Sequence, residues 1–103
     1  MKPSIKPQDC ENIQEIRDAI DRIDLEIIEQ LVQRHDFVKE IVKYKKGDEE
    51  GIIARERKEL VLKHRQAWAE KRGLDPEMIE EIFRLLIEKN IQMQREIFNS
   101  NNK

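Results

Sequence analysis

The fold is decided by residues 12–46, which read NIQEIRDAIDRIDLEIIEQLVQRHDFVKEIVKYKK without a glycine or a proline. Apolar residues recur there every three or four positions, and this spacing predicts an amphipathic helix with an apolar seam. The seam consists of Ile13, Ile16, Ile20, Ile23, Ile27, Leu31, Val38 and Ile41. At 1.5 Å per residue the helix would be about 50 Å long, which is too long for a chain of 103 residues to cover unaided.

Two further helices are expected after this stretch. Residues 46–51 (KGDEEG) carry two glycines among acids and predict a loop. A second helix is predicted over residues 53–71, and its inner side is expected to carry Leu60, Val61, His64 and Trp68, with His64 and Trp68 as core residues. Gly73 is placed to end this helix.

A strong helix start follows at Asp75, Pro76 and Glu77, with an N-cap acid, a proline at the first helical position and an acid in the first turn. The third helix carries Ile79, Ile82, Phe83, Leu86, Ile87, Ile91 and Ile97, and is expected to fray over residues 99–103. The prediction is an all-α fold of three helices, the first much the longest, in a single domain that shares its core with a partner chain.

The composition excludes several classes of protein. Charged residues make up 41% of the chain, but 20 basic and 22 acidic residues leave a net charge of −2. No overall field therefore favours nucleic acid or an anionic membrane, and any bound anion must be met by a local cluster of cations. Cys10 is the one cysteine, which excludes an intramolecular disulfide. With no apolar run long enough for a membrane span, we expect a soluble, cytoplasmic protein.

Four polar residues fall inside the apolar arcs when the helices are projected at about 100° per residue. Arg34 and Lys45 lie near the centre of the first seam, and Asn90 and Gln94 lie on the inner face of the third helix. Buried cations and amides are costly unless they are paired or solvated by a ligand, so together they indicate a polar pocket between helices. The alternative is that they only fix helix register in a non-catalytic dimerisation module.

Arg17 and the start of the second helix supply further candidates on other grounds. Arg17 lies about 100° around the helix from Arg34 and roughly 25 Å along it, so it reaches such a pocket only from an antiparallel partner chain. The second helix is predicted to open with Arg55, Glu56 and Arg57, where two arginines oppose the helix dipole unless an anion binds nearby. No nucleophile motif, P-loop or metal-type histidine spacing is present, so neither metal nor cofactor is expected and the pocket offers electrostatic stabilisation.

These residues resemble the all-helical, type II chorismate mutase family, the AroQ class. The resemblance rests on residues 16–24 (IRDAIDRID), on Arg34, on Lys45, on residues 55–57 (RER) and on residues 86–88 (LIE) through Gln94. It covers about residues 10–98 and places charged residues at set intervals in three helices. It implies an intertwined homodimer with two equivalent active sites and no cofactor.

The resemblance also implies a role for each residue. Arg34, Arg55 and Arg17 of the other protomer would bind the carboxylates of a small dicarboxylate substrate. Lys45 and Gln94 would donate to the ether oxygen of the breaking bond, while Glu56 would hold the ring hydroxyl. The implied reaction is the Claisen rearrangement of chorismate to prephenate.

Some positions depart from this pattern. Ile52 and Asn90 replace residues that many mutases use near the substrate hydroxyl. Residues 9–10, 19–25, 65–70 and 73–75 resemble the isochorismate pyruvate lyase branch of the same fold, which forms salicylate and pyruvate. Arg55 followed by Glu56 favours the mutase, and the two activities can coexist in one site.

Overall fold

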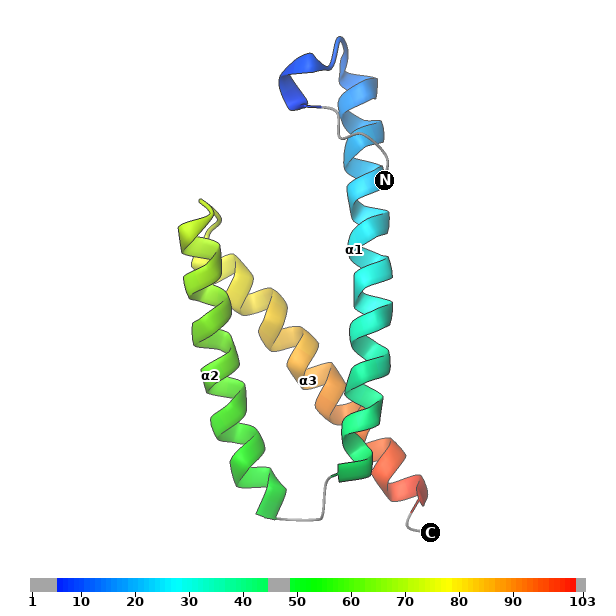
Figure 1. Ribbon diagram of the computed structural model, residues 1–103, viewed down its shortest axis with the longest axis vertical. Helices are drawn as coiled ribbons and strands as arrows, with labels where there is room; N and C mark the ends of the chain where they lie inside the picture. Colours follow the sequence, from blue (N-terminus) through cyan, green and yellow to red (C-terminus); the bar gives the residue numbers. More distant parts are fainter. Residues whose placement is uncertain (1–5, 45–48, 102–103) are drawn as a thin grey trace. The chain divides into compact units, whose positions relative to one another are not determined.

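The computed structural model describes the backbone of residues 6–44 and 49–101 and the side chains of residues 6–44 and 55–100. All regular structure in these residues is helical (Figure 1). The elements are the short 3-10 helices η1 (Pro7–Asp9) and η2 (Val42–Tyr44) and the α-helices α1 (Ile13–Ile41), α2 (Glu49–Lys71) and α3 (Pro76–Asn101). The predicted all-α fold of three helices is confirmed, and α1 is the longest, although with 29 residues against 26 in α3 it is not much the longest.

The start of α1 is fixed by its own side chains. The Asn12 Oδ1 atom accepts a hydrogen bond of 2.9 Å from the Glu15 backbone N–H, and the Glu15 carboxylate accepts one of 2.8 Å from the Glu11 N–H. Two N–H groups at the helix start are thereby satisfied, in the manner of a capping box. At the other end α-helical geometry stops at Ile41 and tightens into η2. The prediction of a helix through Lys46 is therefore too long for residues 42–44, and Lys45 and Lys46 lie outside the described residues.

The loop predicted over residues 46–51 is wrong for residues 49–51, because α2 begins at Glu49. Two acids in the first turn stabilise a helix start through its dipole, and one glycine costs only about 1 kcal/mol relative to alanine. Residues 46–48 lie outside the described residues.

The turn between α2 and α3 follows its sequence signals. Gly73 has φ +78°, and the Gly73 and Leu74 N–H groups donate to the Glu70 and Ala69 carbonyls at 3.2 and 2.9 Å. This is a Schellman motif, in which glycine avoids the strain of the left-handed conformation. Asp75 Oδ1 then accepts from the Glu77 N–H at 3.0 Å and caps α3. The predicted helix stop and helix start are confirmed.

The third helix is longer than predicted. It continues to Asn101, where fraying from Asn99 was expected. Phe98 is half-buried in the last turns of this helix. The propensity cost of Asn and Ser in a helix is well under 1 kcal/mol each, so the polar tail does little to oppose a longer helix.

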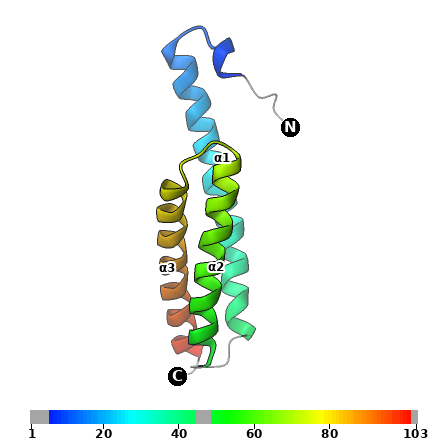
Figure 2. The ribbon, with the colours of Figure 1, turned by 90° about the vertical axis from the view of Figure 1, so that its left-hand side faces the viewer.

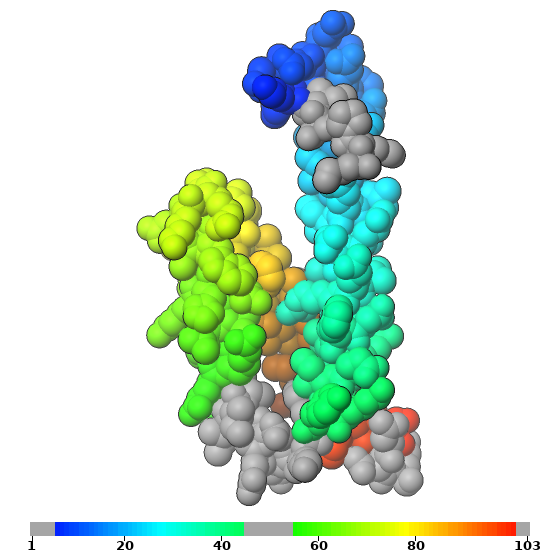
Figure 3. All heavy atoms as spheres, viewed as in Figure 1, coloured from blue at the N-terminus to red at the C-terminus, as the bar shows by residue number. Residues whose placement is uncertain are grey.

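The chain forms two compact units, residues 1–36 and 37–103. In the described part of the first unit, residues 6–36, only Cys10, Ala19, Leu31 and Arg34 are even partly buried. Figure 3 shows the cyan part of α1 as a column one helix wide. The seam isoleucines of this unit, Ile13, Ile16, Ile20, Ile23 and Ile27, are all exposed. No other described residue of this unit covers them.

In the second unit α2 and α3 pack side by side as an antiparallel pair, and η2 also packs on α3 (Figures 1 and 2). The buried apolar residues among those described are Val42, Val61, Leu62 and Ala69. Of the predicted inner residues of α2, Val61 is buried, but Leu60, His64 and Trp68 are exposed. The buried stripe runs through residues 61, 62, 65 and 69, and its centre lies about 115° around the helix from that of the stripe 60, 64 and 68.

Candidate functional site

Gln94 is the one buried polar residue among the described side chains, with 8% of its surface exposed. Its Nε2 atom donates a hydrogen bond of 3.0 Å to the Val38 carbonyl oxygen. Val38 is in the last turn of α1, where carbonyls lose their partners within the helix. The bond therefore joins the end of α1 to α3 and gives the Gln94 amide nitrogen a backbone acceptor.

Asn90 lies one turn before Gln94 and is half-buried. The two positions share a face of α3 because residues four apart are neighbours on a helix surface. Half-buried apolar residues, Ile87 and Ile91, flank them. The structure thus brings two amides together on the inner face of α3, as the periodicity predicts.

The two arginines of α1 lie in the first unit and have different surroundings. Arg34 is half-buried, and this burial lowers the pKa of its guanidinium. Arginine remains cationic at neutral pH in proteins, so a charge is held there at a desolvation cost. Arg17 is exposed. The combination of these arginines with residues of the second unit stays a prediction.

Arg55 and Glu56 are both exposed in α2. Because α2 begins at Glu49, they lie in its second turn and not at its start. The argument that Arg55 opposes the helix dipole is therefore wrong, since the dipole acts mainly within the first turn. Lys45 lies outside the described residues.

A charged network between α2 and α3 was not anticipated from the sequence. The Arg84 guanidinium contacts Glu80 at 2.7 Å and Glu59 of α2 at 3.9 Å, while Lys58 pairs with Glu88 at 3.6 Å. The hydrogen bond with Glu80 raises the pKa of Arg84. The i,i+4 spacing of Glu80 and Arg84 could have indicated their pairing. Arg84 and Lys58 are therefore paired with carboxylates of the protein itself.

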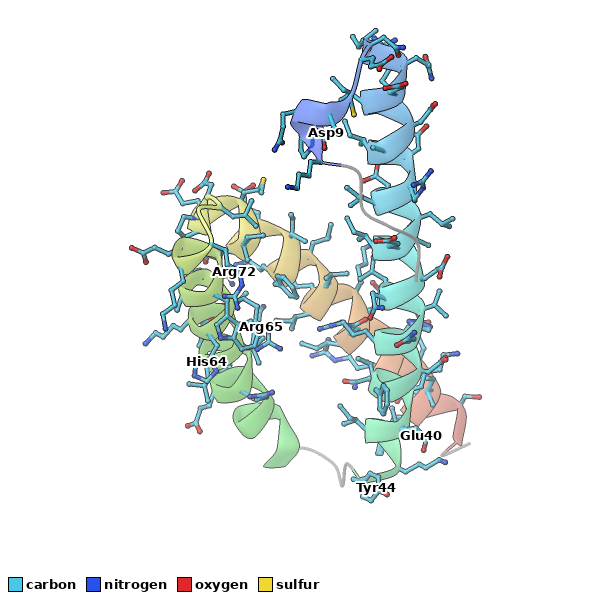
Figure 4. The ribbon with its side chains drawn as sticks, turned by 45° about the horizontal axis from the view of Figure 1, so that its top comes forward. Asp9, Glu40, Tyr44, His64, Arg65 and Arg72 are labelled. Carbon is cyan, nitrogen blue, oxygen red and sulfur yellow. The ribbon has the colours of Figure 1, made fainter. Side chains whose placement is uncertain are left out.

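Arg65 joins the same two helices through aromatic contacts. Its guanidinium carbon lies 4.5 Å from the centroid of the Trp68 ring and 5.8 Å from that of Phe83 in α3. Figure 4 shows Arg65 on the side of α2 that faces α3. Such cation–π contacts stabilise a partly desolvated guanidinium. Trp68 lies in the same helix as Arg65, and about half of its surface, 51%, stays exposed, so Arg65 rather than Trp68 makes the contact with α3.

A hollow in the first unit carries the wrong charge for an anionic ligand. It is lined by Asp9, Glu11, Glu15, Asp18, Ala19 and Arg22. Asp9 is labelled in Figure 4. One arginine among four carboxylates would repel a dicarboxylate, so this hollow is not the predicted pocket.

Comparison with known proteins fits the all-helical fold. Residues 16–95 match the family described as chorismate mutase type II, and the chain belongs to this family. The isochorismate pyruvate lyase of Pseudomonas aeruginosa is similar, with 43% identity over 81 residues that cover 79% of each chain. The matched range contains every candidate site residue, namely Arg17, Arg34, Lys45, Arg55, Glu56, Asn90 and Gln94. Within the part of the chain that the structure describes, no helix is both long enough and apolar enough to cross a bilayer.

Proposed function

We propose that this protein is a chorismate mutase that converts chorismate to prephenate. The observation that carries the proposal is the family match over residues 16–95, because it includes the cations and amides that the helical pattern directs inward. The burial of Gln94 and the partial burial of Arg34 support it. Polar groups are retained in such positions at a cost that a bound ligand offsets.

In this proposal the residues act by binding and electrostatics. Arg34, Arg55 and the partner's Arg17 hold the two carboxylates in the conformer that brings the reacting carbons together. Lys45 and Gln94 donate to the ether oxygen, where negative charge develops as the C–O bond breaks. Glu56 accepts from the ring hydroxyl, with Asn90 beside it. A rearrangement within one molecule requires no nucleophile, and the proposal includes none.

The second protomer is part of the proposal because α1 has an uncovered seam. Ile16, Ile20 and Ile23 are each about half exposed in the single chain, and exposed apolar surfaces of this extent are typical of interfaces. An antiparallel copy of α1 would cover the seam and bring Arg17 near the middle of its partner helix. The homodimer is thus expected to complete both the core and the site.

A second candidate activity is isochorismate pyruvate lyase. It is favoured by the relative with that name, which is 43% identical over most of both chains. The presence of Arg55 before Glu56 favours the mutase. Both reactions use a cationic pocket that stabilises a departing enolpyruvyl oxygen, so one site can support both.

One paired assay tests the two activities. Purified protein is given chorismate, with prephenate measured, and separately isochorismate, with salicylate and pyruvate measured. Prephenate formation at the higher kcat/KM supports the mutase, and salicylate formation at the higher value supports the lyase. Lys45→Ala is the control for a contaminating enzyme, because it is expected to abolish either turnover while the helical circular dichroism remains. If neither substrate is consumed, the non-catalytic dimerisation module is the remaining interpretation.

A further inference from the structure

The contact between the end of α1 and α3 contains two buried residues, Val42 and Gln94. Val42 of η2 is 7% exposed and Gln94 is 8% exposed, and η2 packs on α3. Val38, whose carbonyl accepts from Gln94, lies four residues before Val42. Residues four apart lie on the same side of a helix, so the packing of Val42 and the hydrogen bond of Gln94 belong to one contact.

We infer that Val42 is a positioning residue, whose packing against α3 holds the Val38 carbonyl within hydrogen-bond distance of Gln94 and so orients the Gln94 amide. The inference rests on the proposed function for its kinetic consequences. Its structural part, the orientation of Gln94, stands on the contacts alone.

The geometry gives Val42 this role for two reasons. The Val38 carbonyl belongs to the backbone, so its position depends on what anchors the last turn of α1. Tyr44 and Lys43, the other residues of η2, are exposed, and the ion pair of Lys43 at 2.8 Å is with Glu40 of α1 and not with α3. Because packed contacts transmit small shifts, removing two methyl groups at residue 42 would allow the last turn to move away from α3. The Gln94 Nε2 atom would then lose its fixed acceptor.

The test replaces Val42 with Ala and compares it with Val42→Ile and with Val32→Ala. Val32 is a valine of α1 that is 56% exposed, so it controls for loss of a valine as such. We expect Val42→Ala to lower kcat about ten- to a hundredfold with KM changed less than about threefold, since misplacement of a transition-state group by an ångström has effects of this size. Val42→Ile and Val32→Ala are expected to stay within about threefold of the parent.

A double-mutant cycle distinguishes positioning from a general loss of structure. If Val42 acts through Gln94, Val42→Ala lowers kcat no further when it is made in Gln94→Ala. If it lowers kcat by the same factor in both backgrounds, Val42 acts independently of Gln94 and the inference is wrong. The parent protein in the same assay shows whether the proposed reaction occurs at all.

A measurement that needs no activity tests the structural part. The Gln94 side-chain amide protons are followed by hydrogen exchange in a ¹⁵N-labelled dimer. Protection in the parent and in Val42→Ile, with at least tenfold faster exchange in Val42→Ala, is the expected result. Unchanged exchange in Val42→Ala would overturn the inference, whichever substrate the protein uses.

Discussion

Replacement of Gln94 separates its structural role from its proposed catalytic role. Gln94→Leu keeps most of the side-chain volume but removes the donor to the Val38 carbonyl, which lies 3.0 Å away in a site that is 8% exposed. Loss of a neutral hydrogen bond, with its acceptor left partly buried, costs about 1–2 kcal/mol. For a domain of this size that lowers the melting temperature by about 4–8 °C per kcal/mol.

The expected loss of activity is larger than the loss of stability. Removal of one donor to a developing oxyanion lowers kcat by about 10²–10³, or about 3–4 kcal/mol. The two effects are measured on the same preparation, by thermal circular dichroism and by chorismate consumption at saturating substrate. A fall in kcat of less than about fivefold, together with the expected melting shift, would show that Gln94 only supports the fold and would refute its assignment as a donor.

Gln94→Glu adds a pH dependence whose sign follows from the same contact. An ionised carboxylate would face the Val38 carbonyl, and both groups are acceptors, whereas the protonated carboxyl can donate. Burial and this acceptor therefore raise the pKa of the introduced carboxyl above the ordinary value of about 4.3. The folded state then binds the proton more tightly than the unfolded chain. The free energy of unfolding of this variant therefore falls as the pH rises above the ordinary pKa of a glutamate carboxyl. Its kcat should also fall with rising pH, and a profile parallel to that of the parent would contradict the proposed donor role.

Three further predictions concern packing, the turn and the dimer. Leu62 is 2% exposed, so Leu62→Ala should lower the free energy of unfolding by about 2–5 kcal/mol in urea titrations. The control Leu60→Ala, at a half-exposed position, should lower it by much less. Gly73→Ala meets no atom within 4 Å of the new Cβ, so only the strain of φ +78° remains, about 1–2 kcal/mol by the same titration. Arg17→Ala and Lys45→Ala should each be inactive, but co-refolded mixtures should regain up to about a quarter of the parent activity, because a two-fold dimer then has one intact site. Inactive mixtures would show that Arg17 and Lys45 act in the same protomer.

The sequence predicts the helices well because their signals are local. The Schellman motif at Gly73 and the cap at Asp75 depend on neighbouring residues only, and both can be inferred from a few letters. The errors have a common cause. The start of α2 depends on the balance of two acids against a glycine, and the inner face of α2 depends on where α3 packs. Periodicity gives a stripe on a helix, but which stripe is covered is a tertiary property.

The candidate site was predictable to the extent that it depends on helical phase. Gln94 and Asn90 were found because an amide inside an apolar arc is anomalous in the sequence alone. The acceptor of Gln94 could not be predicted in this way, because the Val38 carbonyl is a backbone group that every residue possesses. The network of Arg84 and the stacking of Arg65 were missed because surface-type charges give no periodic signal when they pair across two helices.

The charge distribution of the described residues bears on how the proposed site would select a dianion in a nearly neutral chain. In the second unit Arg84, Lys58 and Arg65 are engaged by carboxylates or aromatic rings, so they are poor sites for a ligand. Arg34 is held partly desolvated, which lowers the pKa of its guanidinium and raises the benefit of an incoming carboxylate. In the proposed site, selectivity for a small dicarboxylate would then depend on Arg34 and the other cations proposed to face the substrate, and not on net charge. Arg34→Lys tests this dependence, because the lysine ammonium keeps the charge but cannot donate two parallel hydrogen bonds to one carboxylate as a guanidinium does. A large rise in KM is the expected outcome.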